Sequence, residues 1–140
     1  MKTSNNYVKQ LLYACLILMG MVSYSQSPNI QWTAISNSAT VDAVDVQVNS
    51  DLSRNGSQLV WSQNGGQTTI EDIFIITAIK GEWDANTMQG NIEYDILSDG
   101  EQGTFKIMGD GQSITMVLEL SNEQSEGSTY VFYINSFTIN

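Results

Sequence analysis

Apolar and polar residues alternate with a period of two along most of the chain after residue 28. Such alternation is typical of β-strands that bury one face and expose the other. The alternating segments are separated by short polar turns and cover residues 30–34, 44–48, 59–61, 88–96, 104–108, 114–120 and 129–139. No window keeps an apolar period of 3.6 residues for three turns, so the sequence predicts strands and no long helix.

The longest candidate strand runs from Thr69 to Trp83. Its middle, residues 73–79 (Ile-Phe-Ile-Ile-Thr-Ala-Ile), is apolar at both odd and even positions. A strand of this kind is expected to be central and covered on both faces. This stretch favours a sandwich, or a barrel with another segment across its outside.

Turn signals connect neighbouring strands, among them Asn55-Gly56, Asp99-Gly100 and the segment 109–111 (Gly-Asp-Gly). The sequence therefore predicts an all-β fold of about eight antiparallel strands, rich in meander connections. A β-sandwich and a small flattened barrel both satisfy this pattern, because each has one inner and one outer face.

Three consecutive strands in the second half alternate without interruption, so their apolar side chains are expected to face inward together. These predicted core residues are Ile92, Tyr94, Ile96, Phe105, Ile107, Ile114, Met116 and Leu118.

The first 25 residues have the pattern of a cleavable signal peptide. Lys2 and Lys9 precede an apolar run, residues 11–22, that is too short to span a bilayer, and 23–25 (Ser-Tyr-Ser) offer small residues for cleavage. We expect residues 26–140 to form a single exported domain, periplasmic or secreted. Lipid anchoring at Cys15 is the alternative, but the apolar run continues past Cys15, whereas a lipoprotein signal places it before the cysteine.

The mature segment holds all 15 acidic residues but only three basic ones, Arg54, Lys80 and Lys106, which gives it a formal net charge of −12. Such a charge repels nucleic acids and anionic lipid surfaces, so we expect neither nucleic-acid binding nor membrane insertion of the mature chain. The only cysteine, Cys15, lies in the signal segment, so the mature domain has no disulfide.

The mature segment also contains no histidine, which leaves few routes to catalysis. A Ser–Lys site would need Lys80 or Lys106, and Lys106 lies between Phe105 and Ile107 on an outward face. Paired carboxylates such as Glu93 and Asp95 occur by chance in so acidic a chain. We therefore predict no catalytic residue, no cofactor and no enzymatic activity. A carboxylate-dependent hydrolase is the enzyme class that stays open, behind the two non-catalytic functions given below.

Four acidic residues, Asp95, Asp99, Glu101 and Asp110, lie near predicted turns and supply the hard oxygen ligands that Ca²⁺ prefers. Their spacing lacks the order of an EF-hand loop, and Asp-Gly is a common turn pair in its own right. The turn interpretation is therefore favoured, and no metal ligand is assigned.

Aromatic residues offer the best argument for binding, because exposed rings stack on sugars and other flat ligands. Most of them share a face with apolar neighbours and are expected in the core. Trp83, near a predicted strand end, and Tyr133, which alternates with Phe132 and Ile134, are the two candidate ligand-stacking residues.

Together these observations predict an exported, non-catalytic binding module whose ligand is a carbohydrate, a protein or a small apolar molecule. The alternative is a structural or adhesion component of an extracellular or surface assembly. In that case the last strand, with Val131, Tyr133 and Phe137 on one face, is the expected free edge.

Overall fold

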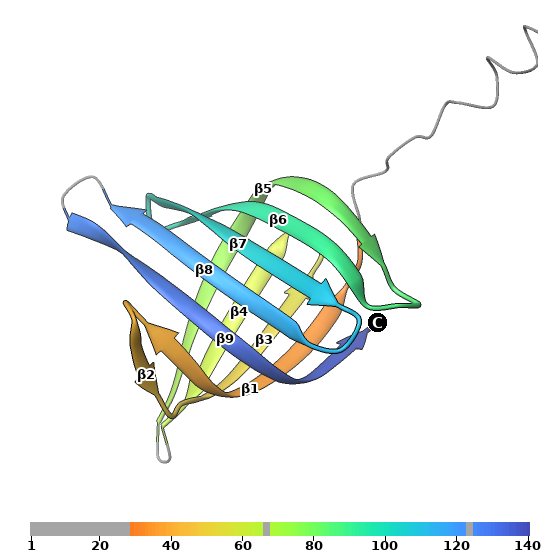
Figure 1. Ribbon diagram of the computed structural model, residues 1–140. Coiled ribbons are helices and arrows are strands. Elements are labelled where there is room, and N and C mark those ends of the chain that lie inside the picture. Colours follow the sequence, from red (N-terminus) through yellow and green to blue (C-terminus); the bar gives the residue numbers. More distant parts are fainter. Residues whose placement is uncertain (1–28, 66–67, 123–124) are drawn as a thin grey trace, which may run out of the picture.

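The computed structural model describes residues 29–65, 68–122 and 125–140, and the rest of the chain, including the predicted signal segment, lies outside these ranges. Nine strands account for nearly all of the described residues (Figure 1). They are β1 (Trp32–Val41), β2 (Val44–Val46), β3 (Asn49–Asn55), β4 (Gln58–Asn64), β5 (Thr69–Asp84), β6 (Gln89–Ser98), β7 (Glu101–Asp110), β8 (Ile114–Asn122) and β9 (Ser125–Ile139).

The strands form one antiparallel sheet in the order β2-β1-β3-β4-β5-β6-β7-β8-β9, and β1 also pairs with β9. This last pairing closes eight strands, β1 and β3 to β9, into a barrel, and β2 is an extra short strand beside β1 (Figure 1). The predicted all-β antiparallel fold is confirmed, and of the two predicted architectures the structure is the barrel. Sequence alternation alone could not separate them, because it is the same in both.

Barrel closure corrects the prediction that the last strand is a free edge. Residues 125–133 of β9 pair with β8 and residues 130–139 pair with β1, so every part of β9 has a partner strand on at least one side. In the described part of the sheet, β2 is the strand with a single neighbour.

The barrel interior is filled by side chains from every wall, as expected for eight strands. Two inner rows run around the barrel in direct register: Tyr94–Phe105–Leu118–Tyr130 and Ile92–Ile107–Met116–Phe132. Seven of the eight predicted core residues are buried, which confirms that prediction, and Ile114 is partly buried against the same cluster.

Strand β5 contains a bulge that explains its doubly apolar sequence. Its register against β6 shifts between Ile76 and Ala78, so Phe74 and Ile76 face inward before the bulge and Ile79 faces inward after it. The outward Ile73 and Ile75 remain 44% and 43% exposed. The predicted cover over the outer face of residues 73–79 is therefore wrong for the described residues: the change of phase at the bulge, not a second packing layer, makes the run continuous.

One end of the barrel, here called the proximal end, is where β1 begins and β9 finishes (Figure 1). The β3–β4, β5–β6 and β7–β8 turns also lie there, because neighbouring strands are antiparallel. At this end the backbone N–H of Ile76 donates a 2.8 Å hydrogen bond to the Ser57 carbonyl. After Ile76, β5 continues to pair with β6 but has no described partner on the side of β4. The barrel wall thus has an opening between the β3–β4 turn and the bulge of β5.

Candidate functional site

Trp83, the first predicted stacking residue, lies on the inner face of β5 and is only partly exposed. It is opposite Gly90, which is in turn opposite Gly109, and a Cβ atom on Gly109 would lie 2.6 Å from Cη2 of the indole. The absence of a side chain at Gly109 therefore makes room for the ring. The indole also contacts Phe137, with ring centres 5.8 Å apart and planes at 61°. This placement favours a packing role for Trp83.

Tyr133, the second predicted stacking residue, points outward from β9 and is 51% exposed. Its phenol oxygen lies 3.3 Å from Oγ1 of Thr40 on β1, and its direct neighbour on β8 is Thr115. Tyr133 and Trp83 are on opposite sides of the barrel wall, so they do not form one aromatic platform. Tyr133 stays a prediction as a stacking residue.

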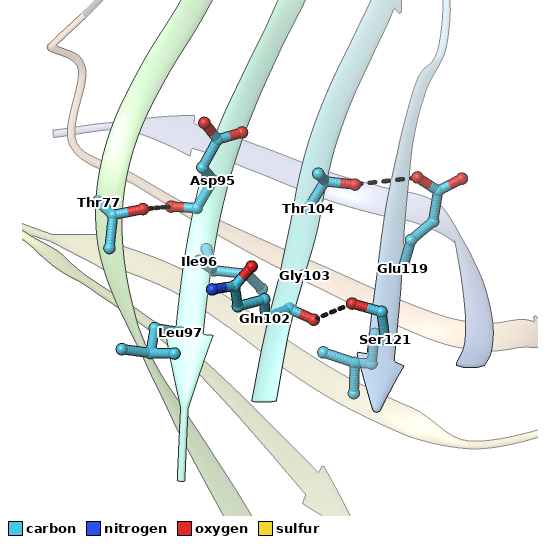
Figure 2. A pocket seen from close by; sticks show the side chains of 10 residues that line it. Thr77, Asp95, Ile96, Leu97, Gln102, Gly103, Thr104, Glu119 and Ser121 are labelled. Atoms are coloured by element: carbon cyan, nitrogen blue, oxygen red, sulfur yellow. Dashed lines mark hydrogen bonds between the residues drawn. The ribbon is translucent and has the colours of Figure 1, made fainter. Parts of the chain in front are cut away.

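The outer face of β5 to β8 carries a shallow depression of about 530 Å³. Figure 2 shows Asp95, Thr104 and Glu119 on three neighbouring strands, where they are in direct register. Thr104 Oγ1 donates a 2.9 Å hydrogen bond to the Glu119 carboxylate, and Thr77 donates to the Asp95 carbonyl at 3.1 Å (Figure 2). The hydroxyl groups of Thr77 and Thr104 in this depression thus already have acceptors within the protein.

Lys80 and Lys106, the two lysines of the described residues, add ion pairs to these polar contacts on the outer face. Lys80 Nζ lies 2.8 Å from the Asp95 carboxylate and 3.6 Å from Glu93, and Lys106 Nζ lies 2.9 Å from Glu119. The hydrogen bond that Lys80 donates to Asp95 raises the pKa of Lys80, and the one that Lys106 donates to Glu119 raises the pKa of Lys106. A general base needs a neutral amine, so both shifts oppose the Ser–Lys chemistry considered above.

The four acidic residues weighed as calcium ligands are not gathered at one point. Asp95 is paired with Lys80, and Asp110 Oδ1 accepts backbone hydrogen bonds from Gln112 (2.8 Å) and Ser113 (2.7 Å). These bonds lower the pKa of Asp110. Within the described residues, no group of three or more acidic side chains is arranged to hold a metal ion.

A second open cavity, of about 510 Å³, lies at the gap in the wall of the proximal end and is here called the proximal cavity. Asn29 and Gln31 from the start of the described chain, Gly56 and Ser57 from the β3–β4 turn, and residues 76–79 of β5 line it together with Arg54. It combines an apolar wall from β5 with polar groups from the two other segments.

Arg54 is the chemically distinctive residue of the proximal cavity, because it is a cation with only 3% of its surface exposed. Its Nη1 donates to the carbonyl of Ile30 at 2.5 Å and its Nη2 to Oδ1 of Asn29 at 2.6 Å. The guanidinium carbon lies 5.3 Å from the centre of the Tyr94 ring, within range of a cation–π contact. Nε is buried and has no hydrogen-bond partner.

The charge of Arg54 is not balanced by a nearby carboxylate in the described part of the chain. The ion pairs there all involve Lys80 or Lys106. Tyr94 beneath the guanidinium has a raised pKa, mainly because it is buried, and the adjacent Arg54 charge opposes this rise. A buried guanidinium held by neutral acceptors keeps a positive potential that can attract an anion.

Sequence reasoning missed Arg54, although a signal was present. Ser50, Leu52 and Arg54 alternate on β3, and the structure buries all three. An arginine in phase with an inward leucine is unusual, since charged side chains are rarely fully buried without a partner. The short segment 49–55 lacks a strong apolar pattern, so its inner face could not be assigned from the sequence.

The chain matches no family model, and no curated protein is significantly similar to it. Over the described residues, the structure has no helix long and apolar enough to cross a membrane.

Proposed function

We propose that this chain is an exported, non-catalytic binding domain that takes a small ligand in the proximal cavity. The observation that carries the proposal is the buried guanidinium of Arg54 at an opening in the barrel wall. Binding sites typically combine an apolar wall with a few placed polar groups, and this cavity has Ile76, Ala78 and Ile79 on one side.

Two features support a non-catalytic role. The segment after residue 25 contains no histidine or cysteine, the side chains that most often act as base or nucleophile near neutral pH. Its two lysines are engaged with carboxylates on the outer face, which keeps their amines protonated. Hydrolysis of ester, peptide or glycoside substrates by the purified domain, abolished by changing two specific carboxylates, would contradict this role.

Export rests on residues 1–25, which lie outside the described part of the chain. The two lysines, the short apolar run and the small residues before Gln26 support cleavage there. Intact-mass measurement of the exported protein should give a chain that starts at Gln26. A mature chain that starts at a lipid-modified Cys15 would overturn both the cleavage site and the soluble location.

Chemical-shift mapping of the ¹⁵N-labelled domain tests the ligand site. A panel of short-chain acids, their neutral amides and simple sugars should include compounds that saturably shift the amide signals of Gly56, Ser57 and residues 76–79. The variant Ala78→Trp should reduce these shifts, because the indole occupies the cavity, and Ala85→Trp in the exposed β5–β6 turn is its control. Saturable shifts confined to the surroundings of Tyr133 would move the site to the outer face.

The alternative, a structural or adhesion component, is favoured by one observation on the outer face. The row Gln58–Ile75–Leu97–Gln102–Ser121 runs across five strands without a charge, although the domain is strongly acidic. Because copies of this acidic chain repel each other, contact between them is least unfavourable along a row without charges. Sedimentation of the purified domain should reveal association that Ile75→Glu abolishes if this role holds, and a monomer at all concentrations excludes assembly from copies of this chain.

A further inference from the structure

We propose that the ligand of the proximal cavity carries a carboxylate that pairs with Arg54, and that a short apolar substituent of the ligand lies along β5. This inference rests on the proposed function, because it names the chemical class of the ligand for the same cavity.

The first argument is the electrostatic situation of Arg54. The other two cations of residues 26–140, Lys80 and Lys106, are on the outer face with carboxylates within 3 Å. Arg54 is buried, yet its partners in the described chain are two neutral oxygens and the Tyr94 ring. Burial of a charge without a counter-charge is costly, and an anion in contact with the guanidinium offsets part of that cost.

The second argument is the number of donors that Arg54 has. A guanidinium has five N–H groups, of which Ile30 and Asn29 accept two hydrogen bonds, and Nε has no partner. A carboxylate accepts several hydrogen bonds from a guanidinium in one plane, which makes it the best-matched small anion. A sugar hydroxyl or an amide oxygen provides no balancing charge.

The third argument is the shape of the cavity around this cation. Ile76, Ala78 and Ile79 form the wall beside the β5 bulge, and Gln31 and Ser57 lie on the facing segments. Gln31 is already engaged, because its Oε1 accepts a 3.0 Å hydrogen bond from the Gly56 amide. The apolar wall that β5 presents next to the cation suits the alkyl part of a short-chain acid.

The test uses the fact that Arg54 is the only arginine of the chain. The ¹⁵N-labelled domain has a single arginine Nε–Hε signal, which reports directly on this guanidinium. Sodium valerate is titrated against valeramide, a neutral molecule of nearly the same shape. We expect valerate to shift the Nε–Hε signal saturably and to bind at least about tenfold more tightly than valeramide, equivalent to 1.4 kcal/mol.

The outcomes separate this inference from the proposed function. Equal affinity of valerate and valeramide at the cavity amides overturns the carboxylate pairing and leaves the cavity as a binding site. Absence of saturable shifts at the cavity with both compounds overturns the pairing, and failure of the whole panel at these amides overturns the proposed function as well. A saturable valerate shift of the Nε–Hε signal that is lost in Ala78→Trp supports the pairing.

A variant of Arg54 adds a second measurement. Arg54→Gln retains hydrogen-bond donors but removes the charge, and thermal unfolding first establishes that the variant folds. In a folded variant the preference for valerate over valeramide should disappear. A preference that persists in Arg54→Gln shows that another group binds the carboxylate. If the variant does not fold, the Nε–Hε titration of the unmodified domain alone tests whether the carboxylate pairs with Arg54.

Discussion

Trp32 and Tyr94 are joined across the barrel interior by a 3.1 Å hydrogen bond from the indole Nε1 to the phenol oxygen. Trp32 comes from β1 and Tyr94 from β6, and both are fully buried. The Tyr94 ring also lies beneath the Arg54 guanidinium. The buried indole N–H of Trp32 therefore has the Tyr94 oxygen as its acceptor, and the guanidinium of Arg54 lies over the ring of the same tyrosine. A change in the occupancy of the cavity is expected to alter the surroundings of Tyr94.

The inner rows of the barrel should be the main source of stability. Leu118 is fully buried on β8, so Leu118→Ala is expected to lower the free energy of unfolding by about 2–5 kcal/mol. Leu97→Ala is the matched control, because Leu97 is 37% exposed on the outer face and should cost less than about 1 kcal/mol. Urea unfolding monitored by tryptophan fluorescence measures both, and equal losses would contradict the assignment of inner and outer faces.

Alternation predicted most strands and the core of β6 to β8, because a period of two follows directly from one-sided burial. It failed where the phase changes within a strand. On β5 the bulge moves the inward positions from Phe74 and Ile76 to Ile79 and Trp83, so the apolar run suggested a second covering layer and the inward position of Trp83 was not predicted, although its place near the strand end was. Closure between β1 and β9 depends on contacts between distant segments that leave no local pattern.

The candidate site was harder to predict than the fold. The proximal cavity is formed by Asn29, Arg54 and residues 76–79, segments whose proximity is fixed only by the curvature of the closed sheet. Tyr133 was identifiable because it alternates with buried Phe132 and partly buried Ile134. Arg54 was not, because its inward position becomes informative only when its strand is known to line the interior.

The β1–β2 turn contains an alanine in a backbone conformation that favours glycine. Ala43 has a φ of 68° and Asp42 a φ of 47°, both in the left-handed region. Because a Cβ atom is disfavoured in this region, Ala43→Gly should raise the free energy of unfolding by about 1 kcal/mol.

The reverse substitution in the β6–β7 turn is the control for Ala43→Gly. Gly100 has a φ of 86°, and a Cβ atom there would have no neighbour within 4 Å. Gly100→Ala should therefore destabilise by about 1 kcal/mol through backbone strain alone. Thermal and urea unfolding measure both variants, and a loss of stability in Ala43→Gly would contradict the turn geometry.

Acid should weaken the β7–β8 turn through Asp110. Backbone hydrogen bonds from Ser113 and Gln112 lower the pKa of Asp110 in the folded state. Because the unfolded chain binds this proton at higher pH, the stabilisation is present above the ordinary pKa of 3.8 and is lost as the pH falls through the lowered folded value.

Asp110→Asn isolates this effect, because the amide oxygen still accepts hydrogen bonds but does not titrate in this range. The difference in unfolding free energy between the unmodified domain and Asp110→Asn should be largest near neutral pH and should shrink below pH 3.8. Urea unfolding at several pH values measures it. A difference that is constant with pH would show that the charge of Asp110 contributes nothing to the turn.

Trp83 should behave as a packing residue of the proximal end. Its indole contacts Phe137 and occupies the space left by Gly109, so Trp83→Ala is expected to destabilise by about 2–4 kcal/mol, because the ring is partly buried. Gly109→Ala should also destabilise, since the added Cβ atom would lie 2.3 Å from the Met88 carbonyl oxygen and 2.6 Å from the indole. The double variant should lose less stability than the sum of the two single losses, because removal of the ring relieves part of this clash.

Tyr133→Ala is the control for an exposed ring and should cost less than about 1 kcal/mol. Unfolding of the four variants by urea decides the matter: if Trp83→Ala leaves stability unchanged but weakens binding of a sugar, Trp83 is a stacking platform and the packing role is wrong.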